Sequence, residues 1–153
     1  MELFEISRAP VICSHSGARS VYEHPRNLRD EQMRACAATG GVVGICGVGA
    51  FLGDNDASVE TFVRHIEYAL DLVGPKHVGI GTDFVFDLQD LEAELSRNPG
   101  LFPRHTPDGP QQFLPPERLP QVAEALLRQG HSTETVLAVL GRNFLRVAEQ
   151  VWR

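Results

Sequence analysis

The chain has 153 residues, 42% of them hydrophobic and 22% charged, a composition typical of one soluble globular domain with its own core. Fourteen basic against twenty acidic residues give a net charge of −6, which argues against a nucleic-acid partner because such a partner needs a basic face. No apolar run approaches the roughly 20 residues that span a bilayer, and the N-terminal MELFEISRAP lacks a signal-peptide pattern. We therefore expect no nucleic-acid or membrane partner.

The first predicted element is a buried strand over residues 9–14 (APVICS), an apolar run that ends near His15. A polar loop with two histidines, a glycine and a proline follows as far as Asn27. Residues 30–39 then have helical character and stop at Gly40–Gly41, as a helix commonly does.

The next predicted elements are a second strand, a helix and a third strand. Residues 41–48 (GVVGICGV) are again apolar, and a turn-rich loop covers residues 50–57. Ser58 is a plausible N-cap for a helix that continues to Gly74–Pro75. Residues 77–82 (HVGIGT) form the third apolar run. Strands that alternate with helices of this length predict an α/β fold with a parallel sheet and right-handed crossovers.

The second half of the chain is predicted to be helical after a long loop. The prolines and weak periodicity of residues 88–116 indicate a loop with room for a single helical turn. We expect a helix over residues 117–129, a second helix that begins at Ser132 and is interrupted at Gly141, and a last amphipathic helix over residues 143–152.

Three parallel strands with several helices make a poor closed unit on their own. A complete (β/α)8 barrel needs about 250 residues, and this chain has enough for about strands six to eight of a TIM barrel plus C-terminal helices. The first strand would then have an open edge with unpaired backbone groups. We expect residues 1–153 to be one partial barrel domain, completed by a missing N-terminal barrel half or by a homo-oligomer.

Polar residues follow the predicted strands, at the edge where α/β barrels carry their chemistry: His15, the loop of residues 50–57, and Asp83. A histidine at a strand end is well placed to bind a metal, although a lone strand-end histidine is more often structural. A Ser14–His15 hydrolase pair is a weaker interpretation because there is no GxSxG motif and adjacent strand residues point to opposite faces.

Two charged residues are further candidates for the site. Arg26, in His24-Pro25-Arg26-Asn27, offers a planar fork of donors that matches a carboxylate, or it is a solvated surface arginine. Asp83, after GIGT, could transfer protons with a raised pKa, pair with a cationic amine, or act as a helix N-cap.

The remaining histidines and the cysteines carry weaker signals. No paired metal spacing links the other histidines; we expect one of them to be partly exposed on a helix and the rest at the surface, and they are His24, His65, His77, His105 and His131. The three cysteines, Cys13, Cys36 and Cys46, include no CxxC pair, which indicates free thiols in a reducing compartment and, with the absent signal peptide, a cytoplasmic location. Burial as small apolar side chains is the simpler role for them.

Three segments in order resemble the C-terminal half of the membrane (renal) dipeptidase family, the M19 peptidases of the amidohydrolase superfamily. The match runs from about Ser7 to the C-terminus and rests on SRAPVICSHSGARSVYEHPRNLRDEQMRACAATGGVVG, HIEYALDLVGPKHVGIGTDF and LLRQGHSTETVLAVLGRNFLRV. The resemblance implies a (β/α)8 barrel that hydrolyses dipeptides with two zinc ions. It implies that His15 is a metal ligand, that Arg26 binds the substrate carboxylate, and that Asp83 transfers protons or contacts the substrate amine.

The sequence also departs from the family pattern. The resemblance implies further metal ligands N-terminal to this segment, and none of them is present here. Phe51 aligns near a tyrosine that assists carboxylate binding in some members, Cys46 aligns near an asparagine, and the common DFDG reads as residues 83–87, DFVFD. We therefore expect a zinc-dependent dipeptidase present as a partial chain that is inactive alone. The alternative is a degenerate, non-enzymatic remnant that acts as a binding or interaction module.

Overall fold

A computed structural model of the chain describes residues 1–98 and 109–152. At its centre lies a three-stranded parallel sheet in the order β1-β2-β3, which confirms the predicted α/β class. The strands are β1 (Ile12–Ser16), β2 (Val42–Cys46) and β3 (Val78–Gly81), each shorter than or shifted from its predicted run.

Helices surround this sheet, and no helix of the described residues is both long and apolar enough to cross a membrane. Their bounds are α1 (Glu2–Ile6), α2 (Asp30–Ala38), α3 (Gly49–Leu52), α4 (Val59–Val73), α5 (Leu88–Arg97), the short η1 (Pro116–Arg118), α6 (Leu119–Arg128), α7 (Thr133–Leu137), the π-helical η2 (Ala138–Arg142) and α8 (Asn143–Val151).

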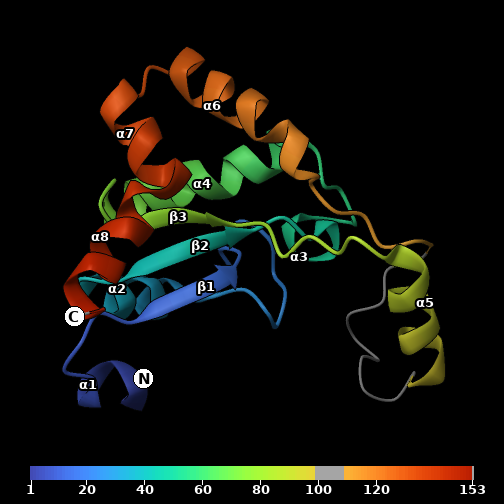
Figure 1. The fold of residues 1–153 in the computed structure, drawn as a ribbon, viewed down its shortest axis with the longest axis horizontal. Coiled ribbons are helices and arrows are strands. Elements are labelled where there is room, and N and C mark those ends of the chain that lie inside the picture. Colours follow the sequence, from blue (N-terminus) through green and yellow to red (C-terminus); the bar gives the residue numbers. More distant parts are fainter. Residues whose placement is uncertain (99–108, 153) are drawn as a thin grey trace.

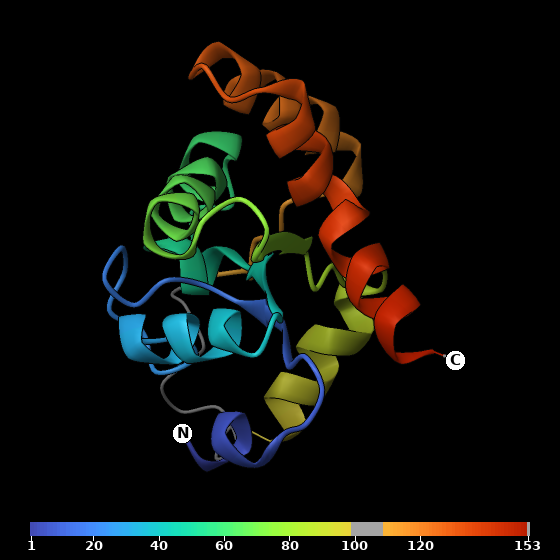
Figure 2. The same cartoon turned by 90° about the vertical axis from the view of Figure 1, so that its left-hand side faces the viewer.

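Strand β2 is buried along its whole length because helices cover both faces of the sheet. Figure 2 shows α2 and α4 on one side of the strands and α8 on the other. Helix α4 has the strongest sequence reason to form. Ser58 is its N-cap and accepts a hydrogen bond from the Thr61 amide, and Phe62, Ile66 and Leu70 are buried at helical spacing. The predicted cap and helix are confirmed.

Helix α8 closes the edge of the sheet where β2 and β3 begin (Figure 1). The buried Asn143 amide donates to the carbonyls of Pro75 and Val78, both at 2.7 Å, and the Arg146 guanidinium donates to the carbonyls of Gly40 and Lys76. These bonds satisfy carbonyls that precede the two strands and the carbonyl of Val78, the first residue of β3.

Glycines make room for this closure and for the neighbouring strand. A Cβ on Gly79 would lie 2.4 Å from the Phe144 ring, and one on Gly44 would lie 2.2 Å from the carbonyl oxygen of Ser14. The ring of Phe144 therefore occupies the space that side chains would fill on this face of β2 and β3, and the glycines that weaken a strand by propensity are required by packing.

The predicted loop over residues 88–116 is wrong in its first part, where α5 forms a ten-residue helix. Asp87 caps it by accepting from the Asp90 amide, and leucines recur at positions 88, 91 and 95. The short helices α1 and α3 were also not expected, whereas the interruption at Gly141 is confirmed by its non-helical φ of 162°. Residues 99–108 of the predicted loop lie outside the described residues.

Candidate active site

His15 lies at the carboxyl end of β1, inside an irregularity of the strand. Cys13 pairs with Val43 and Ser16 pairs with Ile45, so β1 holds one extra residue between these pairs, as in a β-bulge. The bulge lets neighbouring side chains meet: Ser14 Oγ lies 2.8 Å from His15 Nδ1. The expectation that these two side chains point to opposite faces is therefore wrong, because the bulge breaks the regular alternation.

This contact suits His15 to metal binding without completing a metal site. When Nδ1 carries the ring proton it donates to Ser14 Oγ, and Nε2 then presents its lone pair to the exposed side. Within residues 1–98 and 109–152, however, no group of three or more His, Cys, Asp or Glu side chains could hold a metal ion. A catalytic zinc normally needs three protein ligands, so these residues alone do not fit a resident zinc.

The loop that carries Arg26 is fixed to the end of β1 by a buried asparagine. Asn27 Oδ1 accepts from the Gly17 amide, and Asn27 Nδ2 donates to the carbonyls of Tyr22 and Phe51 at 2.9 and 2.7 Å. Every polar atom of this amide is therefore used inside the protein.

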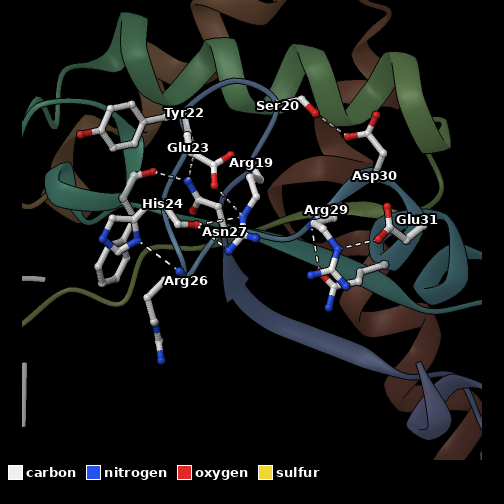
Figure 3. Close-up of polar contacts among 12 residues, drawn as sticks. Arg19, Ser20, Tyr22, Glu23, His24, Arg26, Asn27, Arg29, Asp30 and Glu31 are labelled. Carbon is white, nitrogen blue, oxygen red and sulfur yellow. Dashed lines mark hydrogen bonds and ion pairs between the residues drawn. The ribbon is translucent and has the colours of Figure 1, made fainter. Parts of the chain in front are cut away.

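Two further contacts hold the same loop, which leaves the Arg26 side chain as its projecting group. The Arg19 guanidinium donates to the His24 carbonyl, and the Ser16 hydroxyl donates to the Arg26 carbonyl at 3.1 Å. Figure 3 shows the Arg26 side chain pointing away from Arg19, His24 and Asn27.

The Arg26 guanidinium lies over an aromatic ring, that of Phe51. The Arg26 guanidinium carbon lies 5.5 Å from the centre of the Phe51 ring, and the His24 ring lies 4.8 Å from the same ring. A cation over an aromatic face is stabilised by the quadrupole of the ring. Phe51, which aligns near a tyrosine of some family members, therefore supplies an aromatic surface for the arginine and has no hydroxyl.

Two histidine predictions are wrong, because His24 was expected at the surface and His65 was expected to be partly exposed on a helix, and both are buried. His24 is 7% exposed, and His65 of α4 is fully buried. His65 Nδ1 accepts from the Ala18 amide at 3.0 Å, so Nε2 carries the proton and donates to the Leu52 carbonyl at 2.9 Å. His77 and His131 are half-buried, and His105 lies outside the described residues.

The role of His65 is to join the loop after β1 to helix α3. Its two partners lie 47 and 13 residues away in the sequence, so helical spacing alone could not show this role. Burial lowers the pKa of the imidazole and favours the neutral ring that these two bonds require.

Asp83 follows β3 directly and has a left-handed backbone, with φ of 54°. An aspartate adopts this conformation more readily than most residues, and such positions are common where a side chain must be aimed at a site. Asp83 is not a helix N-cap, because the cap of α5 is Asp87. The exposed Asp83 carboxylate instead lies 4.0 Å from the Cys46 thiol at the end of β2.

The Cys46 thiol is affected by the charges of both candidate residues, Arg26 and Asp83. Burial raises the pKa of this thiol to about 12. Two smaller effects oppose each other: the Asp83 carboxylate raises the pKa, and the Arg26 guanidinium lowers it. Cys46 therefore lies within electrostatic range of Arg26 and Asp83 and is itself an inert, protonated group near neutral pH.

Arg26 and Asp83 line one pocket of about 430 Å³ at the carboxyl edge of the sheet. The other lining residues are mainly apolar: Val48, Phe51, Val85, Leu91, Glu94, Leu95, Gln111 and Phe113. His15 lies at the same edge, because a Cβ added to Gly81 at the end of β3 would be 3.3 Å from the His15 Cα. His15 does not line this pocket.

A cavity of about 690 Å³ between α4 and α6 is larger, but its lining includes no residue of a strand or of the loops that follow the strands. We place the candidate site in the smaller pocket, since ligands of open α/β sheets bind outside the carboxyl ends of the strands.

Comparison with known proteins identifies the family of the chain. A family model described as membrane dipeptidase, peptidase family M19, matches residues 1–99. The fold and the match place the chain in a class of peptidases, the M19 family. The chain belongs to the membrane dipeptidase family.

Curated relatives are similar to this chain over most of its length. It is 34% identical over 150 residues to the uncharacterized protein in the pqqA 5'region of Klebsiella pneumoniae, which covers 95% of the chain and 48% of that protein. It is 33% identical over 149 residues to dipeptidase ataJ of Aspergillus terreus, which covers 95% of the chain and 32% of that protein. The chain thus spans about half or less of the length of these relatives.

Solved structures extend the likeness to three dimensions. An amidohydrolase from Pseudomonas aeruginosa is 33% identical with a TM-score of 0.83, over 99% of this chain and 48% of that one. Dipeptidase AC, a metallopeptidase of family M19, is 25% identical with a TM-score of 0.74, over 99% of this chain and 40% of that one.

Proposed function

We propose that this chain provides the substrate-holding part of a zinc-dependent dipeptidase. The observation that carries the proposal is that Arg26 and Asp83, 57 positions apart (83 − 26), line the same pocket beside the carboxyl ends of the strands. Among the described residues, neither side chain forms an ion pair with another side chain. One cation and one anion are thus available to a ligand.

A dipeptide is a zwitterion with its charges a fixed distance apart. The Arg26 guanidinium matches the terminal carboxylate with two parallel N–H donors, and the Asp83 carboxylate accepts from the terminal ammonium. In this proposal Asp83 also passes a proton to the amine that leaves when the peptide bond breaks. A longer peptide would leave one charge without its partner inside the pocket, which disfavours it.

In this proposal β1, β2 and β3 are about strands six to eight of a TIM barrel, and His15 is one ligand of a two-zinc centre. When bound, zinc would supply a hydroxide near neutral pH and polarise the peptide carbonyl. The remaining ligands would come from a missing N-terminal barrel half, which corresponds to the part of the family length that this chain does not span, or from side chains of a second copy in a homo-oligomer. We also propose that the protein acts in the cytoplasm, without nucleic-acid or membrane partners.

The test separates binding from turnover. The chain is titrated with glycylglycine and with glycylglycinamide, which lacks the carboxylate, and binding is followed by NMR. We expect the amide to bind about tenfold more weakly, and Arg26→Gln to remove this difference because the guanidinium is gone. Arg34→Gln, an equal charge change at an exposed position of α2, should keep it. Equal binding of both ligands to the unaltered chain would contradict the proposal.

Turnover is the second arm. With zinc added, the chain alone should hydrolyse no dipeptide, because the described residues include no three-ligand metal group. Turnover with stoichiometric zinc would refute the proposed inactivity of the isolated chain.

The lack of a three-ligand metal group among the described residues is also compatible with a second candidate function, a non-enzymatic module that binds ligands or proteins. A cooperative urea transition with a sizeable m-value would support an independently folded module, whereas a broad transition with ANS binding would support an incomplete barrel.

A further inference from the structure

Helix α5 is amphipathic but contributes nothing to the core. Leu88, Leu91 and Leu95 recur at helical spacing, yet none of the ten residues of α5 is buried. An apolar stripe on a helix normally packs against the protein. In α5 it borders the pocket instead, because Leu91 and Leu95 line the same space as Arg26 and Asp83.

The segment that brings Phe113 to the pocket is held in place by hydrogen bonds. Phe113 pairs as an antiparallel bridge with Val48, and the Leu114 amide donates to the Gly47 carbonyl at 2.8 Å. The Asn55 side chain binds the same segment at both edges, accepting from the Gln112 amide and donating to the Pro110 carbonyl. Backbone pairing thus fixes Phe113 in the lining of the pocket that Leu91 and Leu95 also line.

The charged residue of α5 that lines the pocket is already paired. Glu94 accepts from Asn98 Nδ2 at 2.6 Å and from Arg97 Nη1 at 3.3 Å. A basic ligand side chain would have to compete with both partners, and an acidic one would be repelled. An uncharged, apolar side chain would bury its surface against the leucines and Phe113 without breaking either contact.

We propose that α5 and Phe113 form an apolar subsite, so that the ligands preferred by this chain are dipeptides with a bulky aliphatic or aromatic side chain. This rests on the proposed function for the two charged ends, whereas the subsite itself rests on α5. The pocket of about 430 Å³ is large enough for such a ligand.

The experiment compares ligands that differ in one side chain, with the chain labelled at its leucine methyl groups. Glycylleucine should bind at least about tenfold more tightly than glycylglycine, because burying a leucine side chain is worth about that much in affinity. Glycyllysine and glycylglutamate should show no such gain. Leu91→Ser with Leu95→Ser should abolish the gain, so that glycylleucine and glycylglycine bind to this variant with similar affinity. Leu127→Ser, at an exposed position of α6, is the matched control and should keep it.

An uncharged probe separates the two levels of the proposal. N-acetyl-leucinamide has the side chain but neither terminal charge, so it should shift the Leu91 and Leu95 methyl signals at high concentration in the unaltered chain and in Arg26→Gln. If it does so while no dipeptide binds more tightly than it, the subsite stands and the proposed role of Arg26 and Asp83 fails. If glycylleucine binds no better than glycylglycine, or if the probe leaves both leucines unchanged, the apolar subsite is overturned.

Discussion

The two edges of the sheet use similar residue types for opposite purposes. At the amino edge, Asn143 and Arg146 direct their donors to backbone carbonyls of the same chain. At the carboxyl edge, Arg26 and Asp83 line an open pocket and form no ion pair with other described side chains. In β/α folds the first edge usually serves stability and the second serves function. We expect substitutions at the two edges to separate in the same way.

The largest effect on stability is expected in helix α8, which closes the amino edge of the sheet. Phe144→Ala removes the ring that packs over Gly44 and Gly79 and leaves a space that glycines cannot fill. We expect it to lower the free energy of unfolding by about 3 kcal/mol, measured by urea denaturation. The matched control is Leu145→Ala, because Leu145 is 61% exposed on the same helix and should cost less than about 0.5 kcal/mol. Equal losses from both substitutions would show that α8 does not close the sheet as described.

A smaller loss is expected at the base of the site loop. Asn27→Ala removes three hydrogen bonds and leaves the Phe51 carbonyl and the Gly17 amide without this partner, at a cost of about 2 kcal/mol. It should also weaken dipeptide binding, since this loop positions Arg26. Asn98→Ala serves as the control in both measurements, because among the described residues the Asn98 side-chain amide donates only to Glu94 of α5. An Asn27 variant with unaltered affinity would mean that the loop does not position Arg26.

The pH dependence of stability is expected to follow His65. Burial lowers its pKa in the folded state below the ordinary 6.5, so the unfolded chain binds the proton more readily. Stability from this group is therefore complete above about pH 6.5 and decreases as the pH falls below that value, by at most about 1.4 kcal/mol per pH unit.

Two carboxylates should act in a lower pH range. The pKa of Asp30 is lowered by the Tyr68 hydroxyl and that of Asp56 by the Thr61 hydroxyl, so the stability that these carboxylates contribute is lost only below the ordinary value of 3.8.

The prediction for His65 is tested by urea denaturation. Urea midpoints between pH 7 and 5 should decrease in the unaltered chain and change less in His65→Gln. A flat profile for the unaltered chain would contradict the assignment of His65 as a buried neutral ring.

The smallest effect on stability is expected from the candidate binding residues themselves. Arg26→Gln loses one exposed cation–π contact, and Asp83→Asn keeps the shape of a residue that tolerates a positive φ. Each should change the free energy of unfolding by less than about 1 kcal/mol while weakening dipeptide binding. A large loss of stability from either substitution would move that residue from a binding role to a structural one.

Much of this arrangement could be predicted from local patterns. Apolar runs located the three strands, Ser58 marked the start of α4, and the parallel order placed Arg26 and Asp83 at one edge. Helix α5 was missed because its ten residues lie beside a proline-rich stretch and its apolar face has no core partner to make it conspicuous.

Long-range contacts account for what the sequence could not reveal. The bulge that joins Ser14 to His15 depends on the register of β1 against β2, which no single strand specifies. His65 looks like any helical histidine until Ala18 and Leu52 are brought to its two nitrogens. Phe51 as the support of Arg26 is likewise a contact between residues 25 positions apart (51 − 26).

The most direct measurement is a map of backbone amide shifts during titration of the labelled chain with glycylleucine. If the carboxyl edge holds both ends of a dipeptide, the changes should cluster at Arg26, Phe51 and Asp83. They should be absent from the larger cavity between α4 and α6, lined by Arg64 and Glu124 among others. Shifts confined to that second cavity, with Arg26 and Asp83 unmoved at saturation, would contradict the account.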